Sequence, residues 1–303
     1  MKPRTIVGLG ELLWDIFPGG KQLGGAPANF AYAANLLGNR GIVASRIGKD
    51  TLGNEVLEKL SGLGLNASFL QIDSAYPTGT VNVQVGPDGQ PAFKVAESVA
   101  WDFLQWETAW RALAEQADAV CFGSLAQRSP RSHETIRAFL KAVRPETARI
   151  FDVNLRQRFY SAEVISESMK LADIVKLNHE ELPRVMETLG LDSDDEESSA
   201  RRVLRVCGAK LVCVTRGASG SLLVSSAGSD EHPGFRGSVV DTVGAGDAFA
   251  AALVHHFLRG ASLAVMNEAA NRMGAWVVTQ AGATPPFDAE VLAQVRSPKG
   301  QRH

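Results

Sequence analysis

The sequence contains few cysteines, no long apolar run and no strong excess of charge of either sign. Only three of its 303 residues are cysteines, and none stands in a C-x-x-C pair. A disulfide framework or a zinc site is therefore not expected, and the thiols are predicted to be reduced and buried. No apolar run reaches the ~18 residues of a membrane-spanning helix, and no signal peptide precedes the first apolar segment, which favours a cytoplasmic protein.

The balance of charge also excludes some partners. The formal net charge is -2, and 45% of the residues are hydrophobic. Such a composition carries no electrostatic signature of binding to nucleic acid or to a membrane, so neither partner is expected. Two nucleotide-binding motifs are missing: there is no G-x-x-x-x-G-K-[ST], and no G-x-G-x-x-G follows the first apolar run. A P-loop enzyme and a dinucleotide-binding Rossmann domain are thereby disfavoured.

Short apolar runs alternate with longer helical patterns along most of the chain. This alternation is typical of an α/β fold with a mostly parallel central sheet and helices on both faces. Strands are predicted at Thr5–Gly10, Gly41–Arg46, Ala119–Gly123, Arg149–Val153, Ile174–Leu177 and Leu211–Thr215. Helices are predicted at Ala26–Leu37, Gly53–Leu63, Arg131–Val143, Ala162–Leu171, Glu180–Leu189, Glu197–Cys207, Ala245–Leu258 and Leu263–Thr279. No repeat or linker divides the chain, so residues 1–303 are expected to form a single domain.

One region interrupts the alternation of strands and helices. Thr78–Val85 alternates in polarity, Gly86–Gly89 has the composition of a turn, and Pro91–Ala96 resumes an extended pattern, which together predict a β-hairpin. Leu12–Phe17 could add another strand. We expect a small β lid, built from about 12–23 and 78–98, over the sheet edge at which α/β folds bind ligands. A hairpin without that role fits the same pattern.

The most informative segment is Asp241-Thr-Val-Gly-Ala-Gly-Asp-Ala-Phe249. A possible strand at Gly237–Val240 leads into its glycine-rich turn, and a helix follows. Gly244 and Gly246 lack a Cβ, so the backbone can come close to a ligand there. The first turn of a helix has unpaired N–H groups and the positive end of the helix dipole, so it suits an anion.

A carboxylate, Asp247, stands inside this expected anion site. It would repel a phosphate unless its purpose is to accept the proton of a hydroxyl that attacks the phosphate. In that arrangement the amides of Gly244, Ala245 and Gly246 stabilise the charge that develops during transfer. Aspartate is also common in a first helical turn because it favours the helix dipole, so the motif alone leaves both interpretations open.

Together with its flanking residues, this segment resembles the D-T-x-G-A-G-D-x-F signature of the PfkB, or ribokinase-like, family of carbohydrate kinases. The resemblance implies a ribokinase-like fold and transfer of the γ-phosphate of ATP to a sugar hydroxyl, with Asp247 as catalytic base. It also implies Mg²⁺ as a cofactor, K⁺ as in several relatives, and a lid that covers the sugar and can form a homodimer contact. Further segments match in family order from Gly8 to about Pro285.

Two N-terminal segments, Gly8-Leu-Gly-Glu-Leu-Leu-Trp-Asp15 and Gly24-Gly-Ala-Pro-Ala-Asn29, look most like those of bacterial fructokinases. By resemblance, Asp15, Gly25 and Asn29 bind the sugar hydroxyls, and Phe93 of the lid packs on the sugar. Ribokinases usually have a lysine where Pro27 stands, which argues against ribose. A plain glycine turn before a helix, with Phe93 in the core of the hairpin, fits the same residues.

The run Phe151-Asp-Val-Asn-Leu-Arg156 follows a predicted strand, and a period of two directs Asp152, Asn154 and Arg156 to one face. It is similar to the D-x-N-x-R segment of fructokinases and ketodeoxygluconate kinases. The guanidinium of Arg156 could pair with a phosphate or with a sugar carboxylate. Ordinary salt bridges at a surface strand end are the alternative.

Three later segments resemble the nucleotide half of these kinases. Asn178 and Glu181 match an N-x-x-E motif associated with nucleotide phosphates and Mg²⁺, although the same spacing is that of a helix capping box. Thr215 and Gly217 lie in a strand–turn–strand segment expected near the ATP phosphates or ribose. Asn271 is expected on the adenine side.

The remaining expectations concern ions and the acceptor. Asp241 could help to hold K⁺, and His255 and His256 are predicted to be partly exposed and not metal ligands. Fructose is the first expected substrate. The alternatives are 2-keto-3-deoxygluconate, a nucleoside, or a non-catalytic relative that binds sugar or nucleotide.

Overall fold

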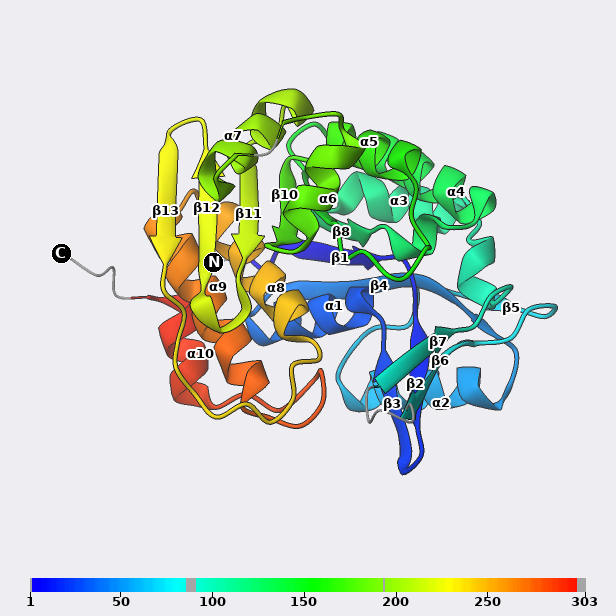
Figure 1. Ribbon diagram of the computed structural model, residues 1–303. Helices are drawn as coiled ribbons and strands as arrows, with labels where there is room; N and C mark the ends of the chain where they lie inside the picture. Colours follow the sequence, from blue (N-terminus) through cyan, green and yellow to red (C-terminus); the bar gives the residue numbers. More distant parts are fainter. Residues whose placement is uncertain (1, 86–90, 193, 299–303) are drawn as a thin grey trace.

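The computed structural model describes residues 2–85, 91–192 and 194–298 and confirms the α/β ribokinase-like architecture (Figure 1). The order of strands in the main sheet is β13 (Gly228–His232), β12 (Ser221–Ser225), β11 (Leu211–Thr215), β10 (Ile174–Asn178), β9 (Ala148–Asp152), β8 (Ala119–Gly123), β1 (Thr5–Leu9), β4 (Arg40–Gly48) and β5 (Leu70–Asp73). Neighbours from β11 to β5 are parallel, whereas β12 and β13 extend one edge in antiparallel fashion. The carboxyl ends of the parallel strands therefore meet at one edge of the sheet.

Helices cover both faces of this sheet (Figure 1). One face carries α3 (Thr108–Gln116), α4 (Pro130–Ala142), α5 (Ala162–Leu171), α6 (Glu181–Thr188) and α7 (Glu196–Cys207). The other carries α1 (Ala26–Leu36), α2 (Thr51–Gly62), α8 (Ala245–Phe257), α9 (Leu263–Val278) and α10 (Ala289–Arg296). Short 3-10 helices are η1 (Ala100–Phe103), η2 (Leu125–Gln127) and η3 (Gly217–Ser219).

The strands are apolar on both sides because both faces are buried. In β10, for example, Val175 and Leu177 pack with α5 to α7, while Ile174 packs with α1, α8 and α9. Successive residues thus contribute to two separate cores. Cys121, Cys207 and Cys213 are free and buried, as predicted. In the described part of the chain, no helix is long and apolar enough to cross a membrane.

A second sheet of four strands forms the predicted lid. Its order is β3 (Gly20–Gly24), β2 (Leu13–Phe17), β6 (Gly79–Val85) and β7 (Pro91–Val95). The strands β2 and β6 pair in parallel, and each continues into an antiparallel hairpin partner. The predicted turn at Gly86–Gly89 lies outside the described residues. In Figure 1 the lid stands beside the end of the main sheet that is formed by β1, β4 and β5.

Three expectations from the sequence need correction. Gly237–Val240 is not a strand. It is an exposed connection, in which the Val240 N–H donates to the Val278 carbonyl at 2.9 Å. His255 and His256 are not exposed, because each is only 4% accessible beneath neighbouring helices. No element was predicted at β5, β13, α3 or α10, and α10 supplies the Val295 carbonyl that lies 2.7 Å from Nε2 of His256.

Candidate active site

The first turn of α8 forms an open, glycine-lined cradle. Gly244 caps the helix in the left-handed region (φ 80°), and a Cβ there would come within 2.7 Å of the backbone of Ala283. Gly246 is exposed, and its missing Cβ would meet only the Nζ of Lys176, at 3.4 Å. Amides at the start of a helix have no intrahelical acceptor, so this turn presents donors and a positive dipole end to the space above it. The glycines therefore have the geometry that the sequence predicts.

Asp247 lies half-buried in this turn and is held by the opposite helix. Its Oδ2 accepts a hydrogen bond from Nδ2 of Asn29 in α1, at 2.8 Å. Burial, reinforced by the negative charge of Asp152, raises the pKa of Asp247 to about 6, against the opposing effects of Asn29, Lys176 and Arg156. A carboxylate that is ionised near neutral pH and has a pKa close to it is suited to accept a proton.

Two more carboxyl groups lie on the lid side of Asp247. Asp15 of β2 is half-buried, and burial raises its pKa to about 6, with Arg156 opposing. Glu11 follows β1, is 5% exposed, and has a pKa raised to about 7 by burial and also by the charge of Asp247. The sequence motifs assign no role to Glu11. Its position after the first strand, among apolar residues, was the available signal.

Gly25 and Asn29 open α1 at the same place. Gly25 has φ 111°, and a Cβ there would lie 2.6 Å from the carbonyl oxygen of Glu11, so a side chain is excluded. Asn29 is 5% exposed and donates one amide N–H to Asp247. Phe93 lies in β7 opposite Val83, but its side chain is outside what the structure describes. The structure thus brings Asp15, Asn29 and Asp247 to one end of α1.

The end of β9 differs from the prediction. The strand stops at Asp152, and Asn154 adopts φ 40°, so a period of two does not extend to Arg156. Asp152 points into the core, where it pairs with Lys176. Arg156 is exposed and its guanidinium makes no hydrogen bond or ion pair to the described residues, yet its charge acts on Glu11, Asp15 and Asp247. It is a cation that faces three carboxyl groups.

The N-x-x-E segment forms a reciprocal cap at the start of α6. Oδ1 of Asn178 accepts the N–H groups of Glu180 and Glu181, at 2.9 and 2.8 Å. The carboxylate of Glu181 accepts the N–H of Asn178 at 2.9 Å and that of Leu155 at 2.8 Å. Burial raises the pKa of Glu181 above its usual value. The capping interpretation is therefore confirmed, while the suggested role at the nucleotide stays a prediction.

The hydrogen bonds of Glu181 also limit how a divalent ion could bind here. Within residues 2–85, 91–192 and 194–298 no three His, Cys, Asp or Glu side chains gather into a metal cluster. Each oxygen of Glu181 already accepts one backbone hydrogen bond, which leaves only part of its capacity free. A Mg²⁺ ion here would be held through waters and through nucleotide phosphates, which is the usual preference of that ion. The residues fit this kind of site and not a direct protein cage.

Thr215 and Gly217 lie at the carboxyl end of β11, beside Asn178. Thr215 is the register partner of Asn178 in the adjacent strand. Gly217 has φ 56°, is exposed, and has no atom within 4 Å of the place where a Cβ would be. This turn leaves open space at the edge of the sheet where the predicted phosphates would lie.

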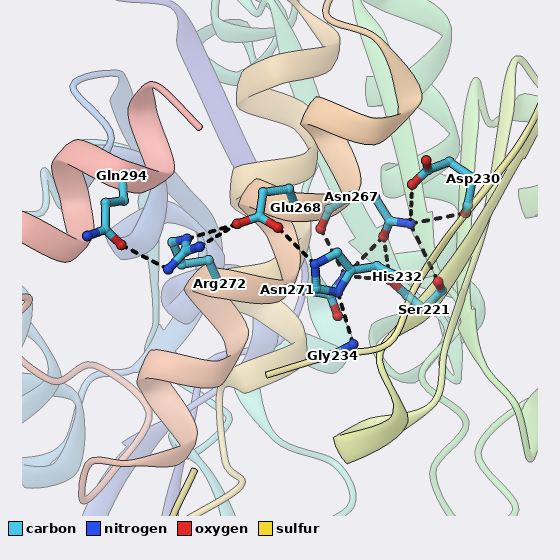
Figure 2. A network of polar contacts seen from close by, with 9 residues as sticks. All are labelled: Ser221, Asp230, His232, Gly234, Asn267, Glu268, Asn271, Arg272 and Gln294. Carbon is cyan, nitrogen blue, oxygen red and sulfur yellow. Dashed lines mark hydrogen bonds and ion pairs between the residues drawn. The ribbon is translucent and has the colours of Figure 1, made fainter. Parts of the chain in front are cut away.

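Asn271 is engaged in a buried polar network between α9 and β12 (Figure 2). Its Nδ2 donates to Oγ of Ser221 at 2.7 Å and to the backbone and side-chain oxygens of Asn267 at 2.9 and 3.0 Å. Ser221 in turn donates to Oδ1 of Asn267 at 2.6 Å, and Nδ2 of Asn267 reaches Asp230. Asn271 is only 7% exposed, so it shapes this edge from beneath.

Asp241 ties two loops together. Its Oδ1 accepts the N–H of Val243, and its Oδ2 accepts the N–H of Gly282, both at 3.0 Å. Gly282 in turn lies beside Gln22 of the lid strand β3. Both oxygens of Asp241 therefore have backbone partners, and a K⁺ ion at this position stays a prediction.

Comparison with known proteins places these features in a group of sugar kinases. A model described as "pfkB family carbohydrate kinase" matches residues 13–290. An uncharacterized sugar kinase of Pyrococcus horikoshii is 31% identical over 283 residues, which cover 88% of this chain and 85% of that protein. Its structure in complex with ATP superposes with a TM-score of 0.81 at 29% identity, covering 96% of this chain and 99% of the other.

Two fructokinases are also similar. The fructokinase of Klebsiella pneumoniae is 30% identical over 258 residues, covering 81% of this chain and 82% of that protein. The fructokinase of Vibrio cholerae, in a structure with fructose, ADP and calcium, has a TM-score of 0.80 and 26% identity, covering 96% of this chain and 98% of the other.

Proposed function

The chain belongs to the pfkB family of carbohydrate kinases, and we propose that it transfers the γ-phosphate of ATP to a hydroxyl of a sugar, with fructose as the preferred acceptor. One observation carries this function. Asp247 stands in the first turn of α8, beside backbone amides that have no acceptor within the helix, and its Oδ2 accepts a hydrogen bond from Asn29 at 2.8 Å. A proton acceptor and anion-binding donors are thus adjacent, as transfer of a phosphoryl group to a hydroxyl requires.

In the proposed reaction, Asp15, Gly25 and Asn29 position the sugar beneath the lid, and Phe93 packs on it. Asp247 accepts the proton of the attacking hydroxyl, whose oxygen forms a bond to the γ-phosphorus. The bond between that phosphorus and the β–γ bridging oxygen breaks, and ADP leaves. The amides of Gly244, Ala245 and Gly246 stabilise the charge that develops on the phosphoryl oxygens.

The other predicted residues serve the nucleotide in this account. Asn178, Thr215 and Gly217 line the phosphate side, and Asn271 shapes the adenine side from its buried network. Bound Mg²⁺, held through waters near Glu181, would neutralise the negative charge of the phosphates. A K⁺ ion near Asp241 would be held by the loop that precedes α8. Two similar structures contain ATP or ADP, and one of these also contains calcium, which supports a nucleotide with a divalent ion.

Fructose is the first choice because two similar proteins are fructokinases, one of them with fructose bound in its structure. A second acceptor, 2-keto-3-deoxygluconate, is favoured by Arg156. This guanidinium is exposed and makes no hydrogen bond or ion pair to the described residues, so it is available to a sugar carboxylate. Retention of Asp247 together with both glycines argues against a non-catalytic relative, since such a protein has no use for the base.

Three less specific features complete the proposal. We take residues 1–303 as one kinase domain with its lid. The free, buried cysteines support a cytoplasmic location. The lid strands β3 and β7 are edge strands of the four-stranded sheet, and such edges can pair with a second copy in a homodimer.

The test is ADP release from the purified protein with Mg²⁺ and ATP over a panel of acceptors. The panel contains fructose, ribose, tagatose, glucose, 2-keto-3-deoxygluconate and several nucleosides. A clear preference for fructose supports both the reaction and the acceptor. Preference for the acidic sugar, abolished in Arg156→Ala, supports the second acceptor. Absence of acceptor-dependent ADP release in a folded protein contradicts the proposed function.

A further inference from the structure

An ion pair is buried in the centre of the main sheet. Lys176 of β10 and Asp152 of β9 are register partners in adjacent strands, and they are 6% and 5% exposed. The Nζ of Lys176 lies 3.0 and 2.8 Å from the two carboxylate oxygens of Asp152. Lysine and aspartate are rarely buried this deeply unless they are paired. Both side chains point to the face of the sheet that α1 and α8 cover, since Ile150 and Ile174, two residues before them, pack there.

The ammonium group lies directly beneath the first turn of α8. A Cβ on Gly246 would be 3.4 Å from Nζ of Lys176, so no side chain separates them. On its other side, away from Lys176, Gly246 is exposed to solvent. On the other flank of Lys176, its register partner in β11 is Cys213, whose pKa burial raises to about 12, so that thiol is neutral. Asp152 is therefore the carboxylate that hydrogen-bonds the ammonium, and the charge of Asp247 acts on it more weakly.

Stability of the sheet alone gives no reason for these two charges. A buried ion pair is often no more stabilising than apolar side chains of similar volume at the same place. The residues that flank Lys176 in β10, Val175 and Leu177, are apolar and fully buried. An apolar pair would continue that pattern. We therefore look for the role of the two charges in the first turn of α8, which lies next to them.

We propose that Lys176, fixed by Asp152, is a positioning residue for phosphoryl transfer, whose ammonium adds positive charge beneath the amides that receive the transferred phosphoryl group. It does not touch the sugar. It acts through the turn of Gly246 and Asp247, so this inference rests on the proposed role of Asp247 as base. The probe that distinguishes it from a purely structural pair is the pH dependence of the rate.

Several charged and titratable groups surround Asp247 and interact with it electrostatically. They are Glu11 after β1, Cys121 of β8, Asp152 of β9, Arg156 after β9 and Lys176 of β10. After burial, the charge of Asp152 raises the pKa of Asp247, whereas Lys176 and Arg156 lower it. Loss of the lysine charge must therefore raise this pKa above about 6, and loss of the aspartate charge must lower it.

The experiment uses three variants of the full-length protein and the acceptor that gives the fastest ADP release. Two are the single variants Lys176→Met and Asp152→Asn. The third is a double variant that combines Lys176→Met and Asp152→Leu. Lys176→Met should lower kcat by about tenfold. It should also shift the acidic limb, the pH range in which the rate falls as Asp247 becomes protonated, to higher pH by roughly half a pH unit or more. Asp152→Asn should shift the limb downward. The double variant should show little shift of the limb, yet keep a reduced kcat, because both opposing charges are gone. The KM for the sugar should stay close to that of the parent.

Asp173→Asn is the matched control. Asp173 precedes β10 at the opposite edge of the sheet, is itself buried, and forms an ion pair with the half-buried Arg149 at 2.8 Å. This variant should lose stability in thermal denaturation without moving the acidic limb. If Lys176→Met does not fold, the double variant, which leaves no unpaired charge, takes its place. A double variant with the parent's kcat, or an Asp152→Asn limb that does not move downward, overturns the inference.

Asp247→Asn separates this inference from the proposed function. If Asp247→Asn retains acceptor-dependent activity, the base is misassigned and the proposed function fails. If Asp247→Asn is inactive while the Lys176 and Asp152 variants keep the parent's kcat and acidic limb, the proposed function stands and only the role of the ion pair is refuted.

Discussion

The two halves of the candidate site use polar residues in opposite ways. On the acceptor side, Glu11, Asp15 and Asp247 are carboxyl groups whose burial raises their pKa values to between about 6 and about 7. On the proposed nucleotide side, Glu181 accepts two backbone N–H groups, and Asn271 donates to the Ser221 hydroxyl and to Asn267. The difference indicates a division of labour. In the proposed function, the acceptor side has carboxyl groups with pKa values near neutral pH, whereas hydrogen bonds fix the side chains of the nucleotide side.

The largest expected effect tests the reactive half. Asp247→Asn removes the proton acceptor but keeps a side chain that can bond to Asn29. Loss of a general base should lower kcat by about 10²–10⁴-fold. ADP release measures the rate, and calorimetric titration with ADP should show nearly unchanged affinity. Near-normal turnover in this variant would remove Asp247 from the mechanism.

The second expectation concerns pH and sharpens the contrast between activity and stability. Since the pKa of Asp247 is about 6, kcat/KM should fall as the pH drops through that value, because the base becomes protonated. The contribution of the three carboxyl groups to the free energy of unfolding should move the other way. Their pKa values are higher in the folded than in the unfolded chain, so this contribution should rise as the pH falls from about 7.5 toward 5.5. His255 and His256, whose pKa values are lowered by burial, contribute in the opposite direction. Urea denaturation of the parent and of Glu11→Gln at several pH values separates the two, and an unchanged pH dependence in Glu11→Gln would contradict the assigned burial of Glu11.

The third expectation applies to the shape-keeping half. Glu181→Gln replaces one acceptor oxygen with an amide that cannot accept the N–H of Leu155 or Asn178. A buried donor left without a partner costs about 1–3 kcal/mol, so the free energy of unfolding should fall by that amount. Urea denaturation measures it, with Glu180→Gln on the exposed neighbour as control. Equal stability of the two variants would show that the reciprocal cap contributes little.

The smallest effect is expected in the network of Figure 2. Asn271→Ala removes the amide that donates to Ser221 and Asn267. Stability should fall by about 1 kcal/mol for hydrogen bonds of this kind, with a KM for ATP raised only a few-fold and kcat nearly unchanged. A variant with normal stability but strongly weakened ATP binding would instead assign Asn271 directly to the nucleotide, and would weaken the contrast between the two halves.

The fold could be predicted from the sequence because apolar periodicity reflects burial on both faces of the sheet. Short or polar elements gave no such signal. The edge strand β13, Gly-Ser-Asp-Glu-His, has no apolar alternation, and α10 was missed, so the burial of His255 and His256 was missed with it. The supposed strand at Gly237–Val240 fails because its valines are exposed.

The site was predictable where a local motif fixes the geometry, and not where distant residues meet. Gly244 and Asp247 occupy the turn that their motif predicts. Asn29 and Asp247 are 218 positions apart, and their hydrogen bond follows only from the packing of α1 on α8. Lys176 and Asp152 were visible as charges at strand ends, but their pairing beneath α8 depends on strand order, which spacing cannot reveal.

The most direct test of the central claim is phosphorus NMR of the wild-type protein with ATP, Mg²⁺ and the acceptor that gives the fastest ADP release. We expect the γ-phosphate signal to be replaced by that of a sugar phosphate, in equal amount to the ADP formed and with little free phosphate. A mixture that yields ADP and inorganic phosphate, with no sugar phosphate, would contradict transfer to a sugar hydroxyl.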